Sequence, residues 1–585
     1  MERTGLWDFK GSEGYIYAAF KNRSDEGENR TLSVARRRNT VLQCLQKFNI
    51  RCSEDAVPNI ALLGSGGGQR AMVGLLGSLV QLDKAGLLDC ILYLSGVSGS
   101  TWCMASLYKE PDWSTKLETV TDKIIKRISG PGVSWEDALA KLKKYYYEKD
   151  FFSLTDVWAV MLVTSYVKEI DEQTLADQWD KHNKDPYPIY AVIDKQCKQH
   201  EEGDPWFEIS PHEAGYSLTG AFVGTSSFGS QFKNKMKKQD EMDMLYLQAM
   251  CSSALAVEEE IWKWIKAHLS LKIKIASENM RQDYNGGNRR SIPQQPKDPN
   301  SSSIDECYQV LLKLVDMNLA VLKGADPSAL DQSIRTTLTD ISGGQRHLNY
   351  PLEKLKDDKT ADKEAAKQYM KQYTMDVCKY VSLEFKLNSW PFDILISICR
   401  CIALWIWGRK YNFLHDMTAY SVPAALLESE TRDYIDAGVL LNSPYFSVLR
   451  KERDIDLIIS LDFSEDDSFT TVTQTAETCK KLKIPFPEVN IASENVKKPK
   501  GFYVFKGQNT PTVIHIPLFN VANCGDKIDA WRKKYGTTQV PYSAEMITEL
   551  MQVAGKNIAI NKAKLLEQIR VIAEAKYSQA QARQI

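Results

Sequence analysis

The stretch NIALLGSGGGQRAMVGLLGSLVQLDKAGLLDCILYLSGVSGSTW, residues 59–102, decides the fold. Its first apolar run, from Ile60, predicts a buried strand that enters a glycine loop, and the run after the loop predicts a helix that ends near Gly86. CILYLSG (90–96) predicts a second strand, which a second helix follows directly. Strand, glycine turn, helix, strand, turn and helix in this order are typical of an α/β fold.

The same pattern returns near the other end of the chain. YIDAGVLL, IDLIISLDF and HIPLFN predict further strands from about residue 431. We therefore expect one α/β domain over 56–560, with a helical and loop-rich insertion at roughly 235–430. Residues 1–55 form a polar, partly helical lead-in, and 561–585 form a helical tail.

Two parts of the predicted insertion are strongly polar, and a third is apolar. Residues 279–305 are rich in Gly, Pro, Ser and Asn and predict a loop. Residues 353–371 are dense in charge and predict a solvated helix. The aromatic-rich stretch from Trp390 to Trp407 is a candidate for contact with a bilayer, and a buried helix is the alternative.

Composition excludes several classes of protein. Lys and Arg number 74 and Asp and Glu 75, for a net charge of −1, so a strongly basic nucleic-acid-binding domain is not expected. Hydrophobic residues make up 43% and charged residues 25%, which is typical of a globular chain. The 12 cysteines form no C-x-x-C pair and predict reduced thiols. We expect no signal peptide, no prenyl anchor, no dedicated metal site and no cofactor.

The glycine loop is a potential anion site, because backbone N–H groups and a helix N-terminus meet there. Its glycines are Gly64, Gly66, Gly67 and Gly68. No Lys-Ser or Lys-Thr follows, which excludes a P-loop. Gly66, Gly68 and Ala71 fit the G-x-G-x-x-A spacing of a dinucleotide site, although the acidic residue expected after the next strand is missing. An oxyanion hole and a purely structural turn are the other interpretations.

Gly96-Val97-Ser98-Gly99-Ser100 lies between a predicted strand and a predicted helix and is similar to a nucleophile elbow. The motif departs from G-x-S-x-G because Ser100 replaces the last glycine. An ordinary strand–helix turn is the alternative. An oxyanion loop one unit upstream would bring N–H donors and the Ser98 hydroxyl to the same edge of the sheet.

A serine nucleophile needs a base, and no histidine follows a predicted strand in a catalytic-type loop. His515 lies in a strand-like run and fits a core histidine, and His212 fits a local turn partner. Asp436 ends a predicted strand and precedes small residues, so it could reach the sheet edge of Ser98. Burial would have to raise its pKa for this role, and a turn-capping aspartate is the alternative.

Three segments together resemble the catalytic domain of the cytosolic phospholipase A2 family, and in particular its gamma branch. They are GSGGGQRAM (64–72), GVSGSTW (96–102) and YIDAGVLLNSPY (434–445), in that order. Further matching segments extend the resemblance over roughly residues 40–560. The resemblance implies a patatin-like α/β fold with a central mixed sheet, flanking helices and an inserted lid or cap region.

The resemblance also implies a role for each matching residue. Ser98 matches the nucleophile and Asp436 the base of a Ser-Asp dyad. Gly67 and Gly68 match the oxyanion donors, and Arg70 matches an arginine that holds the substrate phosphate. A guanidinium beside the loop suits a phosphodiester, and a structural ion pair is the alternative for Arg70.

We therefore expect a calcium-independent enzyme that cleaves a fatty-acyl ester of glycerophospholipids or lysophospholipids and that also transfers acyl groups. Its partners are a phospholipid membrane surface and these lipids, with no nucleic acid, and its location is cytoplasmic with peripheral association with intracellular membranes. Two other hypotheses stay open: a non-catalytic lipid-binding protein on the same fold, and a nucleotide-dependent enzyme that uses the glycine loop.

Overall fold

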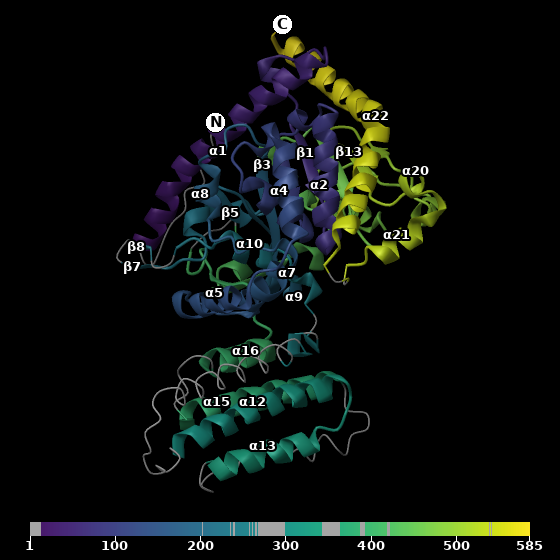
Figure 1. Cartoon of the computed structure of the whole chain (residues 1–585). Coiled ribbons are helices and arrows are strands. Elements are labelled where there is room, and N and C mark those ends of the chain that lie inside the picture. The colour runs from purple at the N-terminus through teal and green to yellow at the C-terminus, as the bar shows by residue number, and fades with distance from the viewer. Residues whose placement is uncertain are drawn as a thin grey trace, which may run out of the picture. The chain divides into compact units, whose positions relative to one another are not determined.

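The computed structural model describes most of the chain, which divides into two compact units (Figure 1). The described residues are 13–201, 203–233, 236–237, 240–256, 258–259, 261–263, 266, 299–341, 363–385, 392–417, 422–537, 539 and 541–584. The first unit comprises Met1–Phe151, Thr155–Ala254 and Trp407–Ile585, and the second comprises Phe152–Leu154 and Leu255–Ile406. All candidate site residues belong to the first unit.

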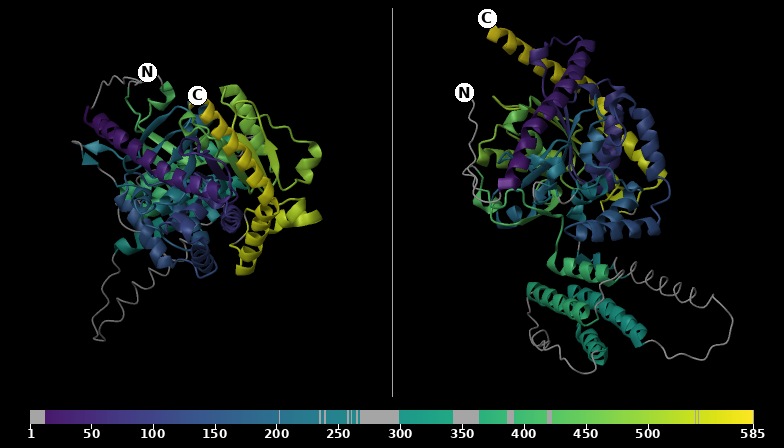
Figure 2. Two further views of the ribbon diagram at one scale, coloured as in Figure 1. Left: turned by 90° about the horizontal axis from the view of Figure 1, so that it is seen from above. Right: turned by 90° about the vertical axis from the view of Figure 1, so that its left-hand side faces the viewer.

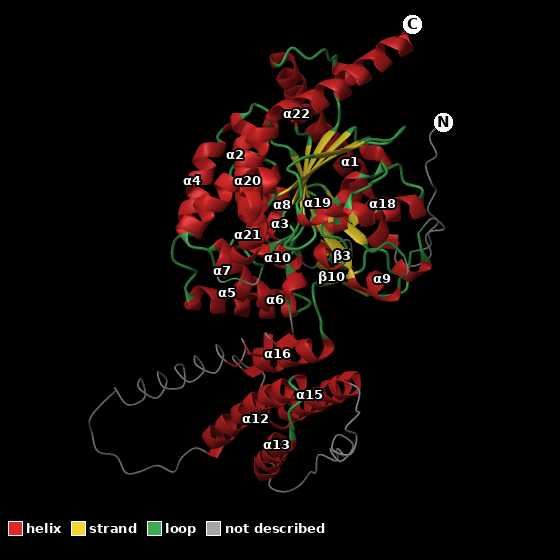
Figure 3. Cartoon of the chain, turned by 90° about the vertical axis from the view of Figure 1, so that its right-hand side faces the viewer, coloured by secondary structure: helices red, strands yellow, loops and turns green. Residues whose placement is uncertain are grey.

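A mixed sheet lies at the centre of the first unit, with helices around it (Figure 3). Over the described residues it has 11 strands, in the order β12-β13-β11-β1-β2-β3-β4-β5-β6, with β10 beside β3 and β9 beside β10. The strands are β1 (Ile60–Gly64), β2 (Tyr93–Gly96), β3 (Tyr187–Asp194), β4 (Trp206–Ile209), β5 (Glu213–Tyr216), β6 (Ala221–Gly224), β9 (Arg409–Tyr411), β10 (Thr431–Asp436), β11 (Leu457–Asp462), β12 (Tyr503–Phe505) and β13 (Thr512–Pro517). A separate hairpin pairs β7 (Phe232–Lys233) with β8 (Met236–Lys237). The predicted α/β class with a central mixed sheet is confirmed.

The middle of the sheet is parallel, since β13, β11, β1, β2 and β3 pair in parallel in that order. Every residue of β1, β2, β3 and β11 is buried. Strands covered on both faces need continuous apolar sequence rather than alternation, and IALLG and LIISLD supply it. Because these strands are parallel, their carboxyl ends meet at one edge, where β1 and β2 lead into the glycine loop and the elbow.

Helices cover the sheet of the first unit. They are α1 (Glu13–Lys47), α2 (Gly68–Lys84), α3 (Gly99–Tyr108), α4 (Leu117–Ile128), α5 (Trp135–Glu148), α7 (Thr164–Val167), α8 (Leu175–Trp179), α9 (Lys195–His200), α10 (Met244–Met250), α17 (Tyr445–Val448), α18 (Thr470–Leu482), α19 (Ser493–Lys497), α20 (Val521–Cys524), α21 (Ile528–Lys534) and α22 (Ala544–Gln584), while α6 (Leu154–Trp158) begins at the boundary with the second unit. The predicted helical tail is α22, which packs along α2 (Figure 1). The two helices approach closely, because a Cβ on Gly77 of α2 would lie 2.6 Å from the carbonyl oxygen of Met551.

The described part of the second unit consists of helices without strands (Figure 2). The longer ones are α12 (Pro299–Leu322), α13 (Ser328–Ile341), α15 (Lys363–Phe385) and α16 (Phe392–Leu404). Buried polar contacts join them: the Tyr373 hydroxyl donates to Asp331 over 2.6 Å, and the Asn318 amide donates to the Thr374 hydroxyl over 3.0 Å. These pairs link α15 to α13 and to α12.

The structure describes parts of the polar and apolar stretches that are predicted inside the insertion. The segment 279–305 lies largely outside the described residues, and its last part, from Pro299, begins α12 rather than a loop. The charged helix predicted over 353–371 is present from Lys363 onward. Most side chains of α16 are buried, so the apolar surface of this helix is used for packing. Among the described helices, none has both the length and the apolar character to cross a bilayer.

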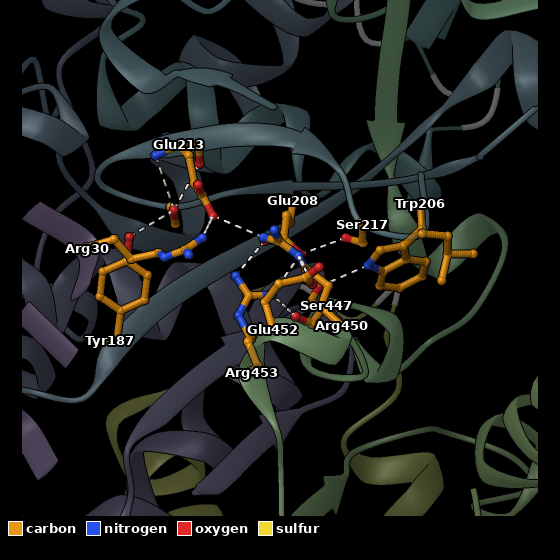
Figure 4. A network of polar contacts seen from close by, with 12 residues as sticks. Arg30, Tyr187, Trp206, Glu208, Glu213, Ser217, Ser447, Arg450, Glu452 and Arg453 are labelled. Carbon is orange, nitrogen blue, oxygen red and sulfur yellow. Dashed lines mark hydrogen bonds and ion pairs between the residues drawn. The ribbon is translucent and has the colours of Figure 1, made fainter. Parts of the chain in front are cut away.

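A buried ion network joins β4 and β5 to the segment after β10 (Figure 4). The side chain of Glu208, on β4, is fully buried and accepts from the guanidinium of Arg453 over 2.5 and 2.9 Å. Arg450 donates to Glu208 over 3.1 Å and to Glu213 over 3.0 Å, and Arg30 of α1 also donates to Glu213. Although burial acts to raise it, the pKa of Glu208 is held below its ordinary value by Arg453 and Arg450.

Neutralising Glu208 should therefore destabilise the first unit. We expect Glu208→Gln to lower the free energy of unfolding by about 3 kcal/mol, because the buried guanidinium of Arg453 loses its charged partner and Arg450 loses one of its carboxylate partners. The matched control is Glu452→Gln, whose carboxylate is 64% exposed and lies 3.7 Å from Arg450. Denaturant unfolding of the two variants measures the difference, and equal midpoints would contradict this role of the network.

Candidate active site

Ser98 forms a strained turn between β2 and α3. Its backbone has φ 51° and ψ −123°, which a residue with a side chain rarely adopts, and the residue is only 5% exposed. The neighbouring glycines are required by contact: a Cβ on Gly99 would lie 1.8 Å from the carbonyl oxygen of Gly68, and one on Gly96 would lie 2.7 Å from the sulfur of Met104. This geometry is that of a nucleophile elbow, as the sequence predicts.

Strand pairing brings Asp436 to this elbow. Strand β2 runs parallel to β3 and ends where Gly96 pairs with Tyr190. Strand β10 runs in the opposite direction along β3 and ends where Asp436 pairs with Val192. Strand β4 pairs with the other edge of β3, so β2 and β10 share one edge. Their ends meet there, because Gly96 and Asp436 pair with residues of β3 that are two positions apart.

Asp436 is a buried carboxylate with a defined set of donors. Its side chain accepts from the N–H groups of Gly438 over 2.8 Å and Ala254 over 3.1 Å, and the Ser98 side chain lies close enough to lower its pKa. Burial raises the pKa of Asp436 to about 6, although these hydrogen bonds act to lower it. The carboxylate is thus a stronger base than an exposed aspartate and lies beside Ser98.

The glycine loop lies directly against the elbow. A Cβ on Gly66 would lie 3.1 Å from the Cβ of Ser98. Gly67 and Gly68 have positive φ angles of 153° and 56°, which turn the chain into the first turn of α2. Among the described residues, no acceptor receives the N–H of Gly67 or Gly68. Two backbone donors at a helix N-terminus are therefore available beside the Ser98 hydroxyl.

Arg70 lies in the first turn of α2 and is 1% exposed. Its Nε donates to the carbonyl of Phe463 over 2.7 Å, its Nη1 donates to the carbonyl of Tyr535 over 2.7 Å, and Glu465 lies 3.6 Å away. These contacts tie the glycine loop to the segment after β11 and to the end of α21. The Nη2 atom lies beside Gly67, 3.0 Å from the position of a Cβ there. Phosphate binding by Arg70 stays a prediction.

Asn442, which is not among the predicted site residues, holds the glycine loop in place. Its carbonyl accepts from the N–H of Gly66 over 2.9 Å, and its side-chain amide donates to the carbonyl of Gly66 over 3.2 Å and to the hydroxyl of Ser464 over 3.0 Å. The amide oxygen lies 2.3 Å from the position of a Cβ on Gly66 and 3.2 Å from that on Gly438. Asn442 therefore fills the space between the glycine loop and the turn of Asp436.

Other serines support the same three segments. The hydroxyl of Ser253 accepts from the N–H of Asp436 over 3.1 Å, and that of Ser100 donates to the carbonyl of Ser65 over 2.6 Å. His515 is fully buried and its Nε2 contacts the carbonyl of Ser468, as expected for a core histidine. The expectation of a local turn partner for His212 is wrong, because its Nε2 contacts the hydroxyl of Ser33 on α1, far away in the sequence. The dinucleotide interpretation gains no support, because the turn after β2 places Ser98 where that fold would need an acidic residue.

Comparison with known proteins defines the class of this site. A family model described as the lysophospholipase catalytic domain matches residues 60–256, which include the glycine loop and Ser98. Cytosolic phospholipase A2 gamma of Mus musculus is 32% identical over 572 residues, covering 92% of this chain and 90% of the relative. The Homo sapiens protein of that name is 31% identical over 569 residues, covering 94% and 96%. The chain therefore belongs to the cytosolic phospholipase A2 family.

Solved structures agree on the fold. Human GIVD cytosolic phospholipase A2 has a TM-score of 0.61 at 19% identity, and the match covers 93% of this chain and 65% of that chain. The same human protein in complex with methyl gamma-linolenyl fluorophosphonate has a TM-score of 0.57 at 20% identity, covering 94% and 64%. The family model and the curated relatives, rather than these structures, make the chain an enzyme of the phospholipase A2 and lysophospholipase type, which acts on phospholipids.

Asn442 should affect turnover more than substrate binding. We expect Asn442→Ala to lower kcat for ester hydrolysis by about tenfold to a hundredfold with little change in KM, because the glycine loop that carries the candidate oxyanion donors loses its fixed position. The matched control is Asn561→Ala, which removes buried amide contacts to Gly501 and Asn557 on and near α22. That control should leave kcat unchanged, and an equal kcat for Asn442→Ala and wild type would contradict the positioning role.

Proposed function

We propose that the chain is a calcium-independent serine acyl hydrolase that cleaves a fatty-acyl ester of glycerophospholipids through a Ser98–Asp436 dyad. The observation that carries the proposal is that β2 and β10 end together on one edge of β3, which places the buried Asp436 carboxylate beside Ser98. No third residue is needed to activate the serine, because the raised pKa of Asp436 already makes the carboxylate a suitable proton acceptor near neutral pH.

In the first half of the reaction, the Ser98 oxygen attacks the ester carbonyl carbon and Asp436 takes the hydroxyl proton. The N–H groups of Gly67 and Gly68 stabilise the negative charge on the carbonyl oxygen. The carbon–oxygen bond to the glycerol then breaks, and the leaving lysophospholipid takes the proton from Asp436. Arg70 is our candidate for the substrate phosphate, through the Nη2 atom beside Gly67.

In the second half, water attacks the acyl-enzyme while Asp436 accepts its proton, and the free fatty acid and the Ser98 hydroxyl result. If a lysophospholipid hydroxyl attacks in place of water, the acyl group is transferred and the enzyme acts as a transacylase. Neither half uses a metal ion, so catalysis is independent of calcium. The fluorophosphonate in the human GIVD structure supports a serine nucleophile by analogy, since fluorophosphonates react with activated serines.

The substrate is presented by a membrane, and we propose that the chain binds the surface of intracellular membranes from the cytoplasm. A role for the second unit as a lid over the active site belongs to the same proposal. The non-catalytic lipid-binding hypothesis predicts association with vesicles without turnover.

Replacement of either dyad residue should abolish fatty-acid release. With phosphatidylcholine vesicles labelled at sn-2 and a calcium chelator present, we expect Ser98→Ala and Asp436→Asn to lower the rate by about a thousandfold or more. Matched controls are Ser578→Ala on α22 and Asp526→Asn, whose carboxylate is 94% exposed; both should release label at the wild-type rate. Equal release by all variants would refute the dyad, and no release by any, with vesicle binding by all, would favour the lipid-binding hypothesis.

The pH dependence should follow Asp436. The base must be ionised to accept the serine proton, so we expect kcat/KM to be constant above a pKa of about 6 and to fall about tenfold per pH unit below it. Rates on a soluble short-chain ester between pH 4.5 and 8 measure this profile without changing the charge of a membrane. A rate that stays constant down to pH 4.5 would show that Asp436 is not the base.

A further inference from the structure

A cavity lies in the first unit, away from the candidate active site, and neither Ser98 nor Asp436 lines it. Its volume is about 690 Å³, and its walls come from α5, the start of α8, the segment that leads into α10, and β9. This volume is within the range of small-molecule sites. The cavity has no part in the proposed reaction.

Lysine amines converge in this cavity. The Nζ of Lys141 contacts Glu172 over 2.5 Å and Asp243 over 2.7 Å. The Nζ of Lys149 contacts the fully buried Asp156. Both of these amines therefore have carboxylate partners.

Lys410 differs from these two lysines. It is 6% exposed and lines the cavity, and no carboxylate of the described chain lies within 4.0 Å of its Nζ. The Nζ of Lys410 lies 4.5 Å from the centre of the Tyr246 ring, and the Nζ of Lys149 lies 3.4 Å from the centre of the same ring. Burial and then the Lys149 charge lower the pKa of Lys410 to about 7. A buried amine without an anionic partner carries a desolvation cost that an anionic ligand would offset.

The exposed wall of the cavity is mainly acidic, although the exposed Lys144, which is paired with Glu172, also lines it. Glu148, Asp177 and Asp240 line it and are exposed on α5, at the start of α8 and before α10. A simple anion would be attracted by Lys410 and repelled by these carboxylates. A ligand with an anionic group at one end and a cationic group at the other would satisfy both.

We propose that this cavity binds a phosphate ester that carries an ammonium group, with the phosphate at Lys410 and the ammonium at the acidic wall. Phosphate fits the inner end because it offers a negative charge and several acceptor oxygens to the Lys410 amine. The same chemistry occurs in free phosphocholine and in the head group of phosphatidylcholine. This site is independent of the Ser98–Asp436 dyad.

Calorimetric titration of the full chain with phosphocholine tests the proposal, with inorganic phosphate and choline chloride as separate probes at equal ionic strength. All proteins carry Ser98→Ala, so that lipids are not hydrolysed. We expect phosphocholine to bind more tightly than either separate probe, and Lys410→Met to weaken it about tenfold or more. The fold should survive, because methionine removes an unpaired buried amine at similar volume. Lys143→Met, on the exposed side of α5, is the matched control and should bind like the parent.

Vesicles of phosphatidylcholine distinguish the two sources of the ligand. If Lys410→Met weakens both phosphocholine and vesicle binding, the site takes the lipid head group; if it weakens phosphocholine binding alone, the site takes the free ester. Both results support the proposal. Unchanged phosphocholine affinity in Lys410→Met, no phosphocholine binding by the parent, or equally tight binding of inorganic phosphate would overturn it.

Discussion

The position of the Asp436 carboxylate beside Ser98 depends on a topological constraint. Two strands from distant parts of the sequence, β2 and β10, approach each other end to end along one edge of β3. The proposed nucleophile lies in the turn after one strand, and the proposed base is the last residue of the other. Burial at this junction gives the carboxylate its raised pKa, so the position that orients Asp436 also sets its basicity.

Close backbone contacts maintain this junction. The elbow fits because Gly99 lies against Gly68, and the loop fits because Asn442 fills the space that a side chain on Gly66 would need. Arg70 fixes the same loop from the other side through two backbone carbonyls. The N–H groups of the loop therefore do not have to reorganise when charge develops on a substrate oxygen, which is the condition for effective electrostatic stabilisation.

Much of this could be predicted from sequence, because local signals carry it. The glycine loop, the elbow at Ser98 and the apolar runs of β1, β2 and β11 are readable from residue spacing. The pairing of β10 with β3 is not, because a short strand shows neither its partner nor its direction. The contacts of Asn442 and the burial of Arg70 depend on segments far apart in the chain, and the helical start of α12 was missed because its first residues resemble a loop. Nothing in the sequence around Lys410 predicts that its amine is buried without a carboxylate in contact.

The central claim is that Ser98 is the nucleophile and that Asp436 activates it. Its most direct test is to treat the full chain with a fluorophosphonate and to map the adduct by peptide mass spectrometry. The account predicts one phosphonylated residue, Ser98, at a rate that falls strongly in Asp436→Asn. An adduct on another serine, or an unchanged labelling rate at Ser98 in Asp436→Asn, would contradict it.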